Sequence, residues 1–123
     1  MNEKQSILLV DDDKEFCMSI AKMFERYDYM ITVAGDGQEA LDLLSEKTFD
    51  LILSDLRMPG VDGMALMEEI KRKKIHSAVV FLTGYGEVES YMDLMNMGAF
   101  EYLNKPADVQ EVLRVIKRAL AAQ

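Results

Sequence analysis

The feature that most constrains the fold is an alternation, repeated five times, of a short apolar run with a longer amphipathic stretch. Runs that are apolar at nearly every position suit strands covered on both faces, and the stretches between them carry apolar residues at helical spacing. The runs are residues 7–10, 30–33, 51–53, 78–82 and 100–103. Helical crossovers connect parallel neighbours, so the pattern predicts an α/β protein of type (βα)₅ with a parallel sheet between two helix layers.

Length and charge narrow the class of protein further. A chain of 123 residues is long enough for one domain with a sizeable core and too short for two ordinary domains, so we expect one domain over residues 1–123. The net charge of −8 argues against binding of nucleic acid by this domain. The basic segment KRKK at 71–74 is interpreted as a solvated helix end.

The cysteine content and the lengths of the apolar segments indicate the cellular compartment of the protein. Cys17 is the only cysteine and has no partner for an internal disulfide, and the apolar run near the N-terminus is too short for a signal peptide. No segment approaches the roughly 20 apolar residues of a membrane-spanning helix. We therefore expect a cytoplasmic protein without a membrane partner.

Charged and hydroxyl side chains follow several of the predicted strands. In an open parallel sheet, ligands bind outside the carboxyl ends of the strands, so these residues are candidates for a site. They are Asp11, Asp12, Asp13, Asp55, Thr83 and Lys105. If the first and third strands are neighbours, at least three carboxylates converge at one edge.

The chemistry of this set points to phosphoryl transfer. Carboxylates that lie close together do not all stay ionised without a cation among them. Oxygen ligands with no His or Cys nearby select a hard cation, and Mg²⁺ fits better than Ca²⁺. A metal, the Lys105 ammonium and the Thr83 hydroxyl together can hold a phosphoryl group in transfer, which makes Asp55 the candidate nucleophile.

The whole chain resembles the receiver domains of two-component response regulators, which belong to the CheY-like superfamily. The similarity runs through the segments ILLVDDD at 7–13, DLILSDLRMPGVDG at 50–63, VVFLTGYG at 79–86 and GAFEYLNKPA at 98–107. The order and spacing of the polar residues also fit, with 28 residues from Asp55 to Thr83, 19 from Thr83 to Tyr102 and 3 from Tyr102 to Lys105. The resemblance implies a flavodoxin-like fold with strand order 2-1-3-4-5.

The resemblance assigns roles to the acidic residues. It implies that Asp55 accepts a phosphoryl group from a histidine kinase or a phosphotransfer protein. It also implies that Asp11, Asp12 and Asp55 hold Mg²⁺ together with the backbone carbonyl of Arg57. A receiver takes part in its own phosphorylation and slow autodephosphorylation but is not otherwise an enzyme.

The same resemblance implies a switch. Thr83 would turn its hydroxyl toward the phosphoryl group, Tyr102 would swing inward behind it, and Lys105 would pair with the phosphate. In the family the bond from this lysine to the following proline, here Pro106, is usually cis. We further predict that Arg57 and Tyr85, large residues two positions beyond Asp55 and Thr83, screen attacking water and lengthen the phosphorylated lifetime.

An output surface is expected on the fourth helix, the fifth strand and the fifth helix. Helical spacing from Val88 puts Tyr91, Met92 and Met95 on one face, which is interpreted as core, with Leu94 and Met97 off that face. The residues expected to form an apolar surface strip are Leu94, Met97, Tyr102 and Val115. We expect this strip to bind a downstream effector domain or protein, or a second copy of the chain after phosphorylation.

Three other functions fit parts of the sequence. A phosphatase of the haloacid dehalogenase type would use Asp11 and Asp13 as a D-x-D pair, but the chain has no room for a substrate cap. A flavodoxin-like FMN binder would need a Ser/Thr-rich loop after the first strand, which is missing. An inert receiver-like binding module is disfavoured because every acidic and basic position is filled. The chain ends soon after the last helix, which suits a stand-alone regulator or a receiver excised from a longer one.

Overall fold

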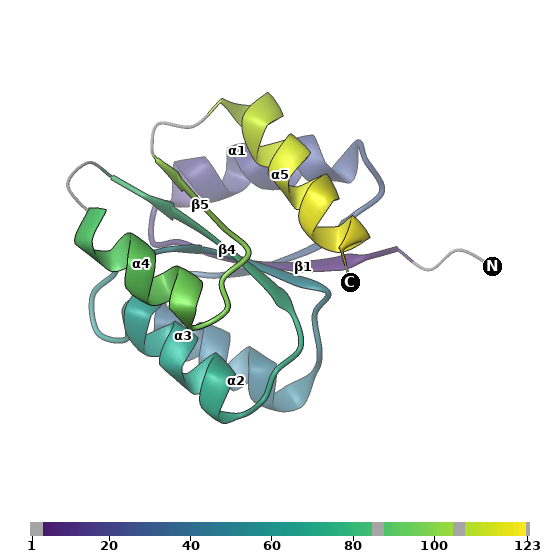
Figure 1. Ribbon diagram of the computed structural model, residues 1–123. Helices are drawn as coiled ribbons and strands as arrows, with labels where there is room; N and C mark the ends of the chain where they lie inside the picture. Colours follow the sequence, from purple (N-terminus) through teal and green to yellow (C-terminus); the bar gives the residue numbers. More distant parts are fainter. Residues whose placement is uncertain (1–3, 85–87, 105–107, 123) are drawn as a thin grey trace.

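The computed structural model describes residues 4–84, 88–104 and 108–122, with the side chains of 88–90 left out (Figure 1). The chain alternates strand and helix throughout, as the sequence predicts. The strands are β1 (Ser6–Val10), β2 (Met30–Ala34), β3 (Leu51–Asp55), β4 (Ala78–Thr83) and β5 (Glu101–Asn104). The helices are α1 (Lys14–Glu25), α2 (Gly37–Glu46), α3 (Gly63–Arg72), α4 (Val88–Asn96) and α5 (Val109–Ala121).

The strands form one parallel sheet in the order β2-β1-β3-β4-β5, which confirms the predicted fold class and strand order. The central strands are apolar and buried along most of their length; β3 is buried at every position. Strands of this kind need helices on both faces of the sheet. The edge strand β2 is less covered, and Met30 and Val33 on it are exposed.

The helices supply those two layers. In Figure 1, α1 and α5 lie on one side of the sheet, and α2, α3 and α4 lie on the other. Side chains alternate along each strand, so Leu9 and Leu53 pack with α1 and α5 while Leu8 and Ile52 pack with the other three helices. The core is therefore two apolar layers separated by the sheet.

Aspartates begin most of the helices. The side chains of Asp13, Asp36, Asp62 and Asp108 accept backbone N–H bonds at the starts of α1, α2, α3 and α5. Such caps satisfy N–H groups that have no partner within the helix. Each crossover thus begins close to the carboxyl end of the preceding strand, which is where the candidate site lies.

Candidate functional site

Three carboxylates meet at the carboxyl ends of β1 and β3. These strands are neighbours, with Val10 opposite Ser54, so Asp11 and Asp55 leave the sheet side by side. One carboxylate oxygen from each of Asp11, Asp12 and Asp55 lies within 4.8 Å of the other two. The sequence predicts this convergence, and the structure brings these three side chains together.

Asp11 is the most enclosed of the three and is held in place from several directions. Its side chain is 2% exposed, and its Oδ1 accepts the backbone N–H of Asp13 at 2.9 Å. Its own N–H donates to the carbonyl of Ala34 on β2 at 3.1 Å, and the Cys17 thiol lies 3.5 Å from its carbonyl oxygen. A buried carboxylate held in this way presents its oxygens in a fixed direction.

Asp12 and Asp13 have separate tasks. The Asp13 side chain caps α1 and accepts the N–H of Phe16 at 3.1 Å. Asp12 is exposed and turns into the acidic cluster. The cap therefore accounts for Asp13 only, and the convergence of the other two acids with Asp55 needs a different explanation.

Asp55 ends β3 and is 9% exposed, so it is largely enclosed yet reachable from the edge of the sheet. Its Oδ1 accepts the backbone N–H of Arg57 at 3.4 Å. The buried Ser54 hydroxyl donates to the Asp55 carbonyl at 2.8 Å. These bonds orient the chain on both sides of the candidate nucleophile.

Two glycines lie in close contact with the backbone of Asp55 and of the loop that follows it. At Gly63 a Cβ would lie 2.8 Å from the Asp55 carbonyl oxygen and 2.7 Å from the Leu56 Cα. At Gly37 a Cβ would overlap the carbonyl oxygen of Val61 in the same loop. Contacts this close leave no room for a side chain, so the starts of α2 and α3 press directly on the loop from Leu56 to Val61.

Thr83 ends β4 on the face of the sheet covered by α3 and α4. It is fully buried, and within the described part of the chain its Oγ1 has no hydrogen-bond partner. Burying a hydroxyl without a hydrogen-bond partner costs free energy. A ligand or a second conformation of the protein would supply the missing partner. Strand β4 lies next to β3, and Leu82, the residue before Thr83, pairs with Asp55. This position suits a movement of the Thr83 hydroxyl toward the Asp55 carboxylate.

Tyr102 lies on β5 and faces the same side of the sheet as Thr83. In the β4–β5 register Tyr102 pairs with Phe81 and Asn104 pairs with Thr83, so Thr83 and Tyr102 are diagonal neighbours. Tyr102 is half-buried, and its ring contacts that of Tyr91 on α4. The two predicted switch residues therefore share one face of adjacent strands.

Lys105, Pro106 and Tyr85 lie outside the described residues, so the predicted phosphate partner, its cis bond and one of the two lifetime residues stay predictions. Arg57, the other lifetime residue, is exposed beside Asp55. The predicted ligand role of its carbonyl also stays a prediction.

The predicted apolar surface strip is wrong at two of its four positions. Leu94 is fully buried in the core under α4, and Val115 is 4% exposed in the core under α5. Met97 and Tyr102 are half-buried. Among the described side chains of α4, the exposed apolar residues are instead Tyr91 at 39% and Met92 at 62%, which helical spacing puts in the core.

Sequence reasoning missed three residues that shape the site. Ser54 fixes the Asp55 carbonyl, and Gly37 and Gly63 press on the following loop. Ser54 carries no signal beyond its position next to Asp55. The glycines do carry one, because each follows an aspartate in an Asp-Gly pair at the start of a helix.

Comparisons with known proteins agree with this geometry. The family model of the response regulator receiver domain matches residues 7–117. The chain is similar to the transcriptional regulatory protein ZraR of Escherichia coli O157:H7, at 36% identity over 115 residues, which make up 94% of this chain and 26% of that protein. It is 34% identical over 113 residues to the DNA-binding transcriptional regulator NtrC of Klebsiella pneumoniae, covering 92% of this chain and 24% of that one. The chain thus spans about a quarter of the length of these curated relatives.

A solved structure gives the same result in three dimensions. The crystal structure of a response regulator receiver domain protein from Clostridium thermocellum matches with a TM-score of 0.89 and 32% identity, over 96% of this chain and 95% of that one. No helix in the described part of the chain is long and apolar enough to cross a membrane.

Proposed function

Since the chain belongs to the family of response regulator receiver domains, we propose that it is a switch in which Asp55 accepts a phosphoryl group from a histidine kinase or a phosphotransfer protein. The observation that carries this proposal is the meeting of Asp11, Asp12 and Asp55 within 4.8 Å at one edge of the sheet. A structural role alone does not explain three converging carboxylates, since Asp13 already caps the helix.

In the proposed reaction a carboxylate oxygen of Asp55 attacks the phosphorus of a phosphohistidine. A P–O bond to Asp55 forms while the P–N bond breaks, and the imidazole nitrogen keeps the electron pair and takes up a proton. Dephosphorylation returns the carboxylate when water attacks the phosphorus and the P–O bond to Asp55 breaks. Asp55 is only 9% exposed, so the surrounding protein limits access to its carboxylate.

The donor set fits Mg²⁺. Asp11, Asp12, Asp55 and the Arg57 carbonyl would hold the ion, an all-oxygen set of the kind that Mg²⁺ prefers. When bound, the ion would neutralise charge on the carboxylates and on the phosphoryl oxygens. Asp11 supports such binding because the N–H of Asp13 holds its carboxylate in position before any ligand arrives.

Thr83 and Lys105 are proposed to read the phosphorylated state. The buried Thr83 hydroxyl gains a hydrogen-bond acceptor when a phosphoryl oxygen comes within reach, and Lys105 pairs with the added charge. A ligand shifts a conformational equilibrium only by what it gains in one state, and this new bond is such a gain. Thr83 and Tyr102 are diagonal neighbours on one face of the sheet. This position supports a coupled movement, in which the Tyr102 ring enters space that the Thr83 side chain leaves.

We propose that the signal leaves through α4, β5 and α5 to an effector. The names of the relatives ZraR and NtrC describe transcriptional regulators, one of them DNA-binding. By analogy, this domain would control a regulator of that kind or form a homodimer when phosphorylated, with nucleic acid bound elsewhere than on this acidic domain. Arg57 and Tyr85 would slow hydrolysis by shielding the site, which Arg57→Ala and Tyr85→Ala test as a faster loss of phosphate.

The proposal is tested by intact mass after incubation with acetyl phosphate and Mg²⁺. The wild type should gain one phosphoryl group, only with Mg²⁺ present, and lose it to hydroxylamine, as expected for an acyl phosphate. Asp55→Asn should gain none. Asp13→Asn is the matched control, because asparagine still caps α1 while the negative charge is removed, and it should gain the group normally.

An adduct that persists in Asp55→Asn would refute the proposed acceptor. Loss of the adduct in Asp13→Asn, together with turnover of a small phosphate ester, would favour the haloacid dehalogenase type. That outcome is opposed by the engagement of the Asp13 carboxylate with Phe16.

A further inference from the structure

We propose that the hollow between α1, β2 and the start of α2 is a binding site for a small organic cation, an amine that carries a compact apolar body. The hollow has a volume of about 450 Å³. Sites for small ligands have volumes of roughly 300–1,000 Å³ and combine apolar walls with a few polar groups. The residues that line this one fall into those two groups.

The floor and one wall are apolar. Cys17, Met18 and Ala21 contribute from α1, and Val33 contributes from β2. Met18 and Val33 are 66% and 42% exposed, so an apolar ligand would cover large side chains that now face solvent. Removing such apolar surface from water favours binding.

The rim is acidic. Asp11, Asp12 and Glu39 line the hollow, with Lys14 as the only cationic side chain among its described lining residues. Glu39 is held there, because its Oε1 accepts the N–H of Gly35 at 2.6 Å. Asp12 and Glu39 are exposed and carry two negative charges against the single ammonium group of Lys14 among the described lining residues. This excess of negative charge is complementary to a cation and repels an anion.

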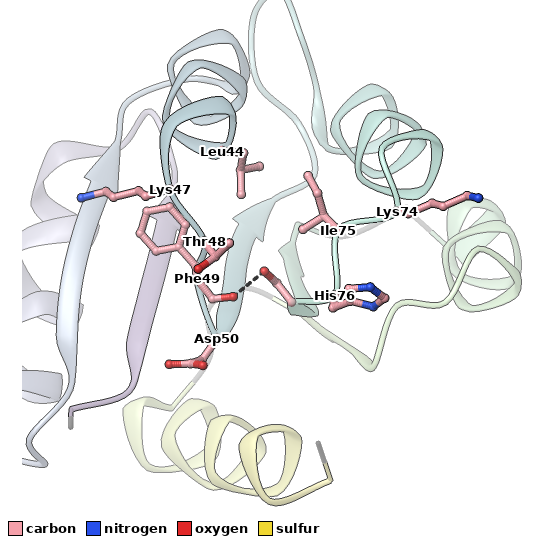
Figure 2. Close-up of a pocket in the computed structure, with 9 residues that line it drawn as sticks. Leu44, Lys47, Thr48, Phe49, Asp50, Lys74, Ile75 and His76 are labelled. Carbon is pink, nitrogen blue, oxygen red and sulfur yellow. Dashed lines mark hydrogen bonds between the residues drawn. The ribbon is translucent and has the colours of Figure 1, made fainter. Parts of the chain in front are cut away.

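The charged groups of a second hollow do not converge in this way. That hollow, of about 360 Å³, lies near the amino ends of β3 and β4, and Figure 2 shows its residues. Lys47 and Lys74 extend to opposite sides in this view, and the Lys47 ammonium lies over the Phe49 ring, 5.5 Å from its centroid. The Ser77 hydroxyl donates to the Phe49 carbonyl, so it is already used. Of these two hollows, the one beside α1 pairs an apolar floor with described charged residues that are mostly acidic.

Two of the rim residues, Asp11 and Asp12, also belong to the acidic cluster. A cation in the hollow would therefore weaken binding of a divalent metal, and the metal would weaken binding of the amine by the same factor. This coupling rests on the proposed function, whereas binding of the amine itself does not. Occupancy of the hollow would then oppose phosphorylation.

The experiment uses the full chain and three probes of similar shape: 2-phenylethylamine, the neutral 2-phenylethanol and the anionic 3-phenylpropionate. Binding is measured by calorimetry, first without metal and then with Mg²⁺. The amine should bind saturably and roughly tenfold more tightly than the alcohol, as expected for several partly exposed charge pairs, and the acid more weakly than either. Alkylation of Cys17, the single thiol, should slow when the amine is present.

A matched pair of variants locates the site. Ala21→Met fills the hollow and should abolish binding of the amine, whereas Ser19→Met adds the same side chain at an exposed position of α1 outside the hollow and should leave it unchanged. Absence of saturable binding, equal binding of the acid, or binding that survives Ala21→Met would overturn the site. If the amine binds and Mg²⁺ does not, the proposed metal site fails while this inference stands. If both bind independently of each other, the coupling is refuted.

Discussion

The ring of Tyr91 on α4 meets the ring of Tyr102 on β5 edge to face, with centroids 5.4 Å apart and an interplanar angle of 89°. This contact joins the exposed surface of α4 to the predicted switch residue. Edge-to-face aromatic pairs stabilise a protein beyond the area that they bury. An inward movement of Tyr102 would have to break the contact.

We expect a double-mutant cycle of Tyr91→Leu and Tyr102→Leu, followed by urea denaturation, to give a coupling free energy of about 1 kcal/mol. Phosphorylation should reduce this coupling, because the inward ring no longer faces Tyr91. Tyr27→Leu, in the turn after α1, serves as the control partner for Tyr102→Leu and should be additive. A coupling that phosphorylation leaves unchanged would contradict the movement of Tyr102.

Removal of the buried Thr83 hydroxyl is expected to stabilise the protein, whereas most substitutions in a protein core destabilise it. Because this buried group has no described hydrogen-bond partner, Thr83→Val should stabilise the unphosphorylated protein, by up to about 1 kcal/mol. Thr32→Val, at a half-buried position on β2, is the control and should fall within about 0.5 kcal/mol of wild type. Thr83→Val should still accept the phosphoryl group but lose the response of Tyr102. A large destabilisation in urea would show that the hydroxyl has a partner.

We expect removal of a charge from the acidic cluster to raise the stability of the metal-free protein and to weaken its binding of metal. Removing one negative charge with Asp12→Asn should stabilise the metal-free protein by roughly 1 kcal/mol, since three carboxylates repel one another. The same change should weaken Mg²⁺ binding and reduce the rise in melting temperature that the ion produces. Asp93→Asn, at an exposed position on α4, changes the net charge equally and should do neither. Equal effects of the two variants would assign the result to net charge alone.

Much of the fold and of the acidic cluster can be predicted from the sequence. Strands buried on both faces leave a strong pattern, and the parallel sheet then forces residues at their carboxyl ends, such as Asp11 and Asp55, to one edge. The orientation of α4 is not readable in the same way. The apolar positions of this helix spread over nearly half of its circumference, with Met92 at one edge and Leu94 at the other, so periodicity alone does not choose which of the two is buried. The packing of α4 against the sheet and α3 decides it, and helical periodicity carries no information on that packing.

The close contact at Gly63 predicts that a single methyl group disturbs the site. Gly63→Ala forces the Asp55 carbonyl or Leu56 to move, which should cost about 1–3 kcal/mol of stability and weaken Mg²⁺ binding. Gly35→Ala is the control, since its Cβ would meet only the Glu39 carboxylate, at an ordinary 3.6 Å. Calorimetric titration with Mg²⁺ and urea denaturation separate the two effects. If Gly63→Ala lowers stability but binds Mg²⁺ normally, the glycine supports the fold and not the site.

The burial of Leu94 changes which residue should be used to test the output surface. Leu94→Ala removes a fully buried side chain and should cost about 2–5 kcal/mol, so any loss of partner binding in that variant would reflect unfolding. Met92 lies two residues away on the same helix and is 62% exposed, so Met92→Glu should change stability by less than about 0.5 kcal/mol. If α4 carries the signal to a partner or to a second copy, Met92→Glu should weaken the assembly that phosphorylation produces, measured by sedimentation. Met18→Glu, a similarly exposed methionine on α1, is the control, and equal loss of assembly in both variants would move the interface away from α4.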